Sequence, residues 1–168
     1  MPNLKFMIAV ALIALASTTP MFAAVTHSGA AQKAIVVVTE TNDQFTSSTS
    51  YSDLVGAAAV ITVPAGKNYL VTARFTAESY CFGLTSFTWC TVQILADGTP
   101  MLPDVGFDFA FDATGNADDA WEGHTVDRSM VLGPGVHTIK VQWAVTDPAE
   151  IFRLDDWSLT VSSYANGH

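Results

Sequence analysis

Residues 68–81, NYLVTARFTAESYC, alternate between apolar and polar side chains. Val71, Ala73, Phe75 and Ala77 fall on one face of a strand with this period, and the polar side chains between them fall on the other face. Such a pattern is typical of a β-strand with one face in a core and one in water. We therefore predict a long, half-buried strand over residues 68–81.

The period of two continues along the chain on both sides of this stretch. It predicts further strands at residues 33–40, 57–63, 89–96, 105–112, 123–132, 136–145 and 151–162. Turn signals separate them, among them Asp97-Gly98 and the Gly-Pro-Gly sequence at 133–135. Eight to ten short antiparallel strands predict an all-β protein, a single jelly-roll-type β-sandwich with its core at residues 33–163.

The last predicted strand changes its phase part of the way along. Phe152 and Leu154 share one parity, whereas Trp157, Leu159 and Val161 share the other. One extra residue at Asp155-Asp156 would return every apolar side chain to the same face. We interpret this position as a β-bulge.

The first 24 residues are predicted to be a signal peptide rather than part of the fold. Lys5 precedes an apolar run from Phe6 to Ala16, and small residues follow up to Ala24. The run is shorter than the roughly 20 apolar residues of a membrane-spanning helix. We expect cleavage between Ala16 and Ala24 and a secreted, extracellular or periplasmic, domain over residues 25–168 with no integral membrane segment.

The expected mature chain is strongly acidic. Only Lys5 is lost with the signal, so six basic residues face sixteen acidic ones and the net charge becomes −10. Nucleic-acid binding requires Lys and Arg to neutralise phosphates, which this balance disfavours. Electrostatic docking to anionic membrane surfaces is disfavoured for the same reason.

Two cysteines, Cys81 and Cys90, form an even set in a chain expected to enter an oxidising compartment. Both have the parity of core-facing neighbours. We predict a disulfide between them, joining adjacent antiparallel strands.

Aromatic side chains around the loop that this disulfide closes are the first candidate for a binding site. The predicted contact set is Phe82, Phe87, Trp89 and Trp121. Exposed aromatic rings on a rigid frame suit stacking on a sugar or contact with a protein. The alternative is that Phe82 and Phe87 cover the end of the core.

Acidic residues between Asp104 and Asp127 are a second candidate. Those considered as calcium ligands are Asp108, Asp112, Asp118 and Asp119, although the sequence contains no EF-hand pattern. The pair Asp155-Asp156 could be catalytic, because β-bulges often direct side chains into functional sites. The structural alternative is that one of them pairs with Arg153 or Arg128, or accepts backbone hydrogen bonds in the bulge.

Motifs for nucleophilic, metal-dependent or phosphate-transferring catalysis are absent from the sequence. A glycan hydrolase would need two carboxylates across a cleft, which Glu78 with Glu122 or Asp127 could provide. His124 and His137 are not at metal-ligand spacing, and His27 and His168 lie near the ends of the chain.

Four segments of the chain resemble known proteins: GPGVHTIKVQW at 133–143, FRLDDWSLTV at 152–161, ARFTAES at 73–79 and VQILADG at 92–98. Together they resemble a group of uncharacterised small secreted bacterial β-sandwich proteins. The turn and strand that end in Gln142-Trp143 also resemble the end of C1q/TNF-like jelly rolls at the level of the fold. That likeness implies binding and trimers, and neither resemblance supplies a catalytic residue.

The function that we expect is that of an exported, non-enzymatic module that binds a carbohydrate or a protein without a cofactor. A self-assembling surface protein, and so a homo-oligomer, is the first alternative. A jelly-roll glycan hydrolase is the second alternative.

Overall fold

A computed structural model describes residues 27–83, 88–114 and 120–168 of the chain. The predicted signal peptide, Phe87, Asp118 and Asp119 lie outside these residues. Within them, no helix is long and apolar enough to cross a membrane.

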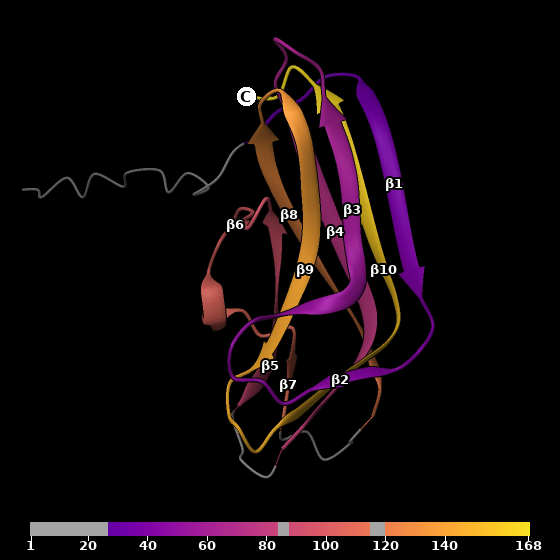
Figure 1. Cartoon of the computed structure of the whole chain (residues 1–168). Helices are drawn as coiled ribbons and strands as arrows, with labels where there is room; N and C mark the ends of the chain where they lie inside the picture. The colour runs from indigo at the N-terminus through magenta and orange to yellow at the C-terminus, as the bar shows by residue number, and fades with distance from the viewer. Residues whose placement is uncertain (1–26, 84–87, 115–119) are drawn as a thin grey trace, which may run out of the picture.

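The described chain folds into two antiparallel sheets packed face to face (Figure 1). The first sheet has the order β1-β10-β4-β8, with β2 paired to β10. Its strands are β1 (Gln32–Glu40), β2 (Gln44–Thr46), β4 (Tyr69–Phe82), β8 (Glu122–Leu132) and β10 (Ile151–Ala165). The second sheet has the order β3-β9-β5-β6, with β7 paired to β5. Its strands are β3 (Ser52–Val63), β5 (Trp89–Ala96), β6 (Thr99–Pro100), β7 (Asp112–Ala113) and β9 (Gly135–Val145).

The order of the strands confirms the predicted jelly roll. Along the chain β1, β4, β8 and β10 belong to the first sheet, and β3, then β5 to β7, and then β9 lie between them in the second. The chain therefore crosses repeatedly between the sheets, as two interleaved Greek keys do. The described residues contain ten strands, within the predicted range.

The alternating pattern of β4 builds the centre of the core. Val71, Ala73, Phe75 and Ala77 are all buried, as predicted. The ring of Phe75 lies 6.0 Å from that of Trp157 on β10 and 5.9 Å from that of Phe111, measured between centroids. Except for the buried Ser79, the polar side chains of β4 point away from the core and cover the outer face of the first sheet.

The predicted β-bulge in β10 is confirmed. The pairing of β10 with β4 shifts between Asp155 and Ser158, and Asp156 has a positive φ of 44°. Leu154 before the bulge and Trp157 after it are both buried. The Asp155 Oδ1 accepts a hydrogen bond from the backbone N–H of Asp156 at 2.9 Å. This contact supports the structural alternative for the acidic pair, in which an aspartate accepts a backbone hydrogen bond in the bulge.

The strand predicted over residues 105–112 is wrong. Gly106–Asp108 forms a short 3₁₀ turn, and only Asp112–Ala113 at its end pairs with β5. Gly106 has a φ of +54°, which lies outside the range of a β-strand. The Trp89 Nε1–H donates a hydrogen bond to the Phe107 carbonyl, which is not part of a sheet ladder. The spacing of the phenylalanines instead reflects two environments: Phe111 is buried in the core, whereas Phe107 packs on Tyr51 with 4.5 Å between ring centroids.

The turn at Asp97-Gly98 joins β5 to β6 as predicted, with both residues at positive φ. The His137 Nδ1–H donates to the Asp97 Oδ2 at 2.7 Å, and its Nε2–H donates to the Gly133 carbonyl at 2.9 Å. Two acceptors require both ring nitrogens to carry protons, which describes the imidazolium. Burial acts to lower the pKa of His137, but the hydrogen bonds to Asp97 and Gly133 and the Asp97 charge raise it above its usual value. The hydrogen bond from His137 lowers the pKa of Asp97.

This pair makes the stability of the protein depend on pH. The His137 contribution is complete below its unfolded pKa of about 6.5 and is lost as the pH rises through the higher folded value. The Asp97 contribution is lost only as the pH falls through a value below about 3.9. We therefore expect His137→Gln to reduce the free energy of unfolding more at about pH 5 than at about pH 9, as measured by urea denaturation. A reduction that is larger at the higher pH would contradict the arrangement.

Candidate functional site

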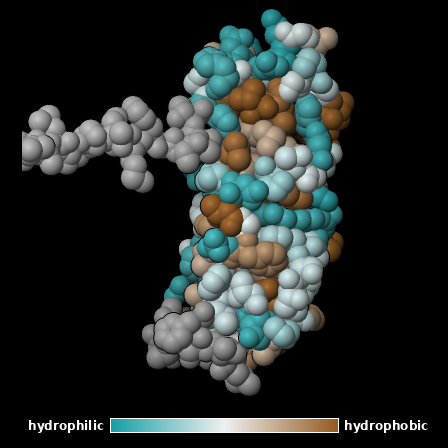
Figure 2. All heavy atoms as spheres, turned by 90° about the vertical axis from the view of Figure 1, so that its left-hand side faces the viewer, coloured by the Kyte–Doolittle hydropathy of each residue, from teal (hydrophilic) through white to brown (hydrophobic). Residues whose placement is uncertain are grey.

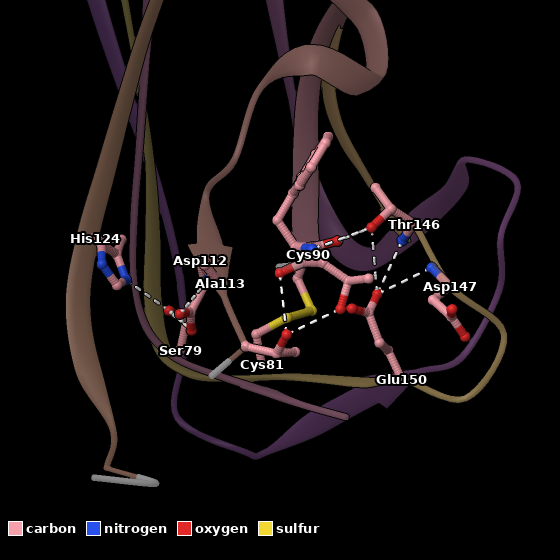
Figure 3. Close-up of a disulfide and its surroundings, with 12 residues drawn as sticks. Ser79, Cys81, Cys90, Asp112, Ala113, His124, Thr146, Asp147 and Glu150 are labelled. Atoms are coloured by element: carbon pink, nitrogen blue, oxygen red, sulfur yellow. Dashed lines mark hydrogen bonds between the residues drawn. A yellow bond between two sulfur atoms is a disulfide. The ribbon is translucent and has the colours of Figure 1, made fainter. Parts of the chain in front are cut away.

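The disulfide at one end of the sandwich is confirmed, with Cys81 and Cys90 Cα atoms 5.8 Å apart (Figure 3). The predicted placement on adjacent strands is wrong, because Cys81 lies on β4 of the first sheet and Cys90 on β5 of the second. Both side chains point into the core, so they meet across the interior rather than along one sheet. The bond therefore links the two sheets covalently at this end of the sandwich.

A buried glutamate packs against this disulfide. The Glu150 Oε2 accepts hydrogen bonds from the backbone N–H groups of Thr146 and Asp147 at 3.1 and 3.0 Å, while Oε1 has no partner (Figure 3). Glu150 and the two cysteines are the group of potential metal ligands that the described residues bring together. Both sulfur atoms are bonded to each other, so Glu150 here orders the turn between β9 and β10.

Ser79, His124 and Asp112 also meet near this end (Figure 3). The Ser79 hydroxyl donates to the Asp112 Oδ2 at 2.7 Å, so the His124 Nδ1–H must donate to the Ser79 Oγ at 2.8 Å. A nucleophilic triad needs the histidine between the serine and the acid, and an accessible serine. With Asp112 as the acid the serine is in the middle. Glu122 lies 3.6 Å from the other ring nitrogen of His124, but Ser79 is fully buried, so these residues link β7 of the second sheet to β4 and β8 of the first.

The predicted aromatic contact set is divided by the fold. Phe82 and Trp121 are about equally exposed, at 38% and 40%, and both contact Tyr80, which lies between them. The ring centroid of Tyr80 lies 6.0 Å from that of Phe82 and 5.8 Å from that of Trp121. Trp89 belongs to the other sheet, where its Nε1–H binds the Phe107 carbonyl at 2.7 Å. It is therefore not part of the same surface.

Residues that the sequence prediction missed complete this surface on the outer face of the first sheet. Phe45 of β2, Arg153 of β10 and Tyr80 of β4 lie side by side in register. Phe45 is 72% exposed, and the Arg153 guanidinium lies over the Trp121 ring, 5.2 Å from its centroid. Arg153 also forms an ion pair with Asp43, which raises its pKa. We call this set the aromatic platform: Phe45, Tyr80, Phe82, Trp121 and Arg153.

Hydroxyl side chains cover the same outer face beyond the platform. Three successive rows cross β10, β4 and β8 in register. The rows are Ser158–Thr76–Thr125, Thr160–Arg74–Asp127 and Ser162–Thr72–Ser129. Arg74 and Asp127 form an exposed ion pair at 2.8 Å in the middle row. We call these residues the hydroxyl face.

The acids considered as calcium ligands do not gather among the described residues. The Asp104 Oδ1 accepts the Gly106 N–H at 3.1 Å, and the Asp112 carboxylate binds Ser79 and the backbone N–H of Ala113. Asp108 lies in the 3₁₀ turn. Each of these side chains therefore belongs to a different local structure.

Of the carboxylates considered for glycan hydrolysis, Glu78 and Asp127 lie on the outer face of the first sheet, whereas Glu122 lies in register with the buried Ser79 at the start of β8. Asp127 is paired with Arg74, and Glu122 lies 3.6 Å from the His124 Nε2. Glu78 is in register with Asp155 on β10. Asp127 and Glu122 are thus engaged with basic neighbours rather than facing each other across a cleft.

The edge of the sandwich formed by β8 and the segment around the 3₁₀ turn has a mixed surface. Its apolar side chains lie in small separate groups among hydrophilic ones (Figure 2). Arg128 is half-buried there, 4.7 Å from the Phe109 ring centroid, and burial lowers its pKa. The free edge of the first sheet at β1, in contrast, exposes Ile35 and Val37.

Comparisons with known proteins add little to this description. No protein-family model matches the chain, and a search of curated proteins gives no match. Dimeric latent PorU from Porphyromonas gingivalis is a solved structure similar to the chain at 13% sequence identity and a TM-score of 0.36. The match covers 82% of this chain and 14% of the PorU chain, and at that TM-score it does not bear on fold or function.

Proposed function

We propose that the protein is an exported, non-enzymatic module that binds a carbohydrate through the aromatic platform. The observation that carries the proposal is the row in which Phe45, Arg153 and Tyr80 lie in register and Trp121 joins at the end. These side chains come from four separate segments of the chain. They nevertheless form one exposed surface on a sheet that the core and the disulfide hold in place.

Exposed aromatic rings in such a row suit stacking on the apolar face of a sugar ring. Aromatic side chains bury a large area for little loss of side-chain freedom, and their rings present an extended flat surface. The hydroxyl face next to the platform supports a carbohydrate rather than a protein partner. Hydroxyl groups donate and accept hydrogen bonds as sugar hydroxyls require, whereas the centre of a protein interface is usually apolar.

Replacement of Trp121 by alanine tests this function. We expect the variant to bind at least ten times more weakly to any glycan that the wild-type protein binds. Tryptophan is common among hot-spot residues, whose truncation costs about 2 kcal/mol or more, and about 1.4 kcal/mol corresponds to a factor of ten. A glycan array followed by titration calorimetry measures the change. The matched control is Phe107→Ala, since Phe107 is also 40% exposed but lies away from the platform.

Equal losses in the two variants, or no loss with Trp121→Ala, would contradict the proposal. Circular dichroism of each variant checks that the fold is intact. Sedimentation of the same samples detects self-association, which would instead support the assembling role.

A further inference from the structure

We infer that the outer face of the first sheet binds an extended, uncharged polysaccharide chain along β4, from the aromatic platform to the far end of the hydroxyl face. This inference rests on the proposed function and adds the class of ligand to it. It follows from the length of the surface, from its hydrogen-bonding groups and from its charge.

The surface is long and continuous. The outward positions of β4 run from Thr72 to Phe82 without leaving the face, and the step from Tyr80 back to Thr72 spans about 26 Å at the rise of a β-strand. Beyond Thr72, Gly29 lies against the side chains of Leu70 and Tyr164 and covers part of this end. The platform occupies one end, and Tyr164 of β10 lies in register with Leu70 at the other. A single sugar ring or a disaccharide would contact only part of this length.

A shallow hollow marks the far part of the hydroxyl face. It has a volume of about 230 Å³ and is lined by Thr72, Arg74, Asp127, Thr160, Ser162 and Tyr164. Pockets that enclose a whole small ligand usually measure about 300–1,000 Å³. This open hollow suits one part of a longer chain, with Tyr164 as a second aromatic contact.

The groups between the two ends can hydrogen-bond to sugar hydroxyls. Thr76 and Thr125 face each other with their hydroxyl oxygens 3.1 Å apart, and Ser158 extends the row onto β10. Glu78 and Asp155, in register between this row and the platform, supply carboxylate acceptors. A chain lying along β4 would therefore meet hydrogen-bonding partners over its whole length.

The charge of the face selects against acidic glycans. The two arginines that point outward from β4 and β10 are each paired with a carboxylate: Arg74 with Asp127 and Arg153 with Asp43. Glu78 and Asp155 add negative charge to the same face. A uronate or sulfate group beside Glu78 and Asp155 would meet repulsion, and the carboxylate partners of Arg74 and Arg153 already occupy these two guanidinium groups. An uncharged chain carries no such penalty.

Oligosaccharides of different length test the inference. The probes are two-unit and six-unit cello-, xylo- and manno-oligosaccharides, titrated by calorimetry, with polygalacturonate as the acidic comparison. We expect at least one series in which six units bind ten or more times tighter than two. We also expect polygalacturonate to bind at least ten times more weakly than that six-unit ligand at low salt.

Variants then separate the two ends of the surface. The double variant Thr72→Ala/Thr160→Ala, in the hollow, should weaken the six-unit ligand several-fold and leave the two-unit ligand unchanged. Trp121→Ala should weaken both. The matched control is Thr62→Ala, an exposed threonine on β3 of the other sheet, which should change neither.

The outcomes distinguish this inference from the proposed function. If two and six units bind equally and the double variant has no effect, the extended site is wrong and the platform alone binds sugar. Tighter binding of polygalacturonate overturns the uncharged class. No binding of any series, or binding unaffected by Trp121→Ala, overturns the proposed function and the inference together.

Discussion

Replacing Trp157 by alanine should lower the free energy of unfolding by about 3–5 kcal/mol, the range for truncation of a large buried aromatic side chain. Trp157 is fully buried directly after the bulge and contacts Phe75 at the centre of the core. Truncation removes its apolar burial and leaves a cavity between the sheets. Urea unfolding followed by far-UV circular dichroism measures the loss without relying on the fluorescence of the deleted residue.

Trp157→Phe is the matched control for this prediction. The Trp157 Nε1–H is buried and has no hydrogen-bond partner, which costs free energy in the folded state. Phenylalanine removes that unpartnered group and keeps most of the ring, so we expect a smaller loss than with alanine. If the alanine variant lost less than about 1 kcal/mol, Trp157 would not be part of a tightly packed core.

Removing the disulfide with Cys81→Ala and Cys90→Ala should lower the free energy of unfolding by roughly 2–3 kcal/mol. The two residues are nine apart in the sequence, so the bond closes a short loop of the unfolded chain, and it also ties the two sheets together. Cys81 lies between Tyr80 and Phe82 on β4, so under the proposed function we also expect weaker glycan binding. Urea unfolding and calorimetric titration measure the two effects.

A reducing agent supplies the control for the disulfide. Wild-type protein in reductant should lose about as much stability as the double variant, and the double variant should not respond to reductant. A double variant as stable as the oxidised wild-type protein would show that packing and the Ser79–Asp112–His124 hydrogen bonds suffice to hold this end.

Local patterns were enough to predict most strands and the bulge. The side chains of β4 that are buried follow from the alternation of apolar and polar residues along this strand. The change in the parity of the apolar residues at Asp155-Asp156 is likewise visible within a few residues of sequence. The segment at 105–112 shows the limit of this reasoning. Its alternation looks like that of a strand, but Gly106 and the hydrogen bond from Trp89 give its backbone another structure.

The candidate site was only partly predictable because it depends on contacts between distant segments. Phe82 and Trp121 were expected from composition, but Tyr80, which joins them, was missed although it shares the outward parity of Thr76 and Glu78. Phe45 and Arg153 become neighbours through the pairing of β2 with β10. One sequence contains no local signal for that register, or for a disulfide that crosses between sheets.

Alternation along β4 has a consequence for how such a protein can change over time. The odd-numbered residues from Tyr69 to Cys81 hold the molecule together, and the even-numbered residues between them form its outer surface. Substitutions at the second set can change the outer surface, and under the proposed function the glycan that it binds, while the first set keeps the chain folded. New specificities can therefore arise by ordinary surface mutation, and the same even-numbered positions are where a laboratory library should be placed.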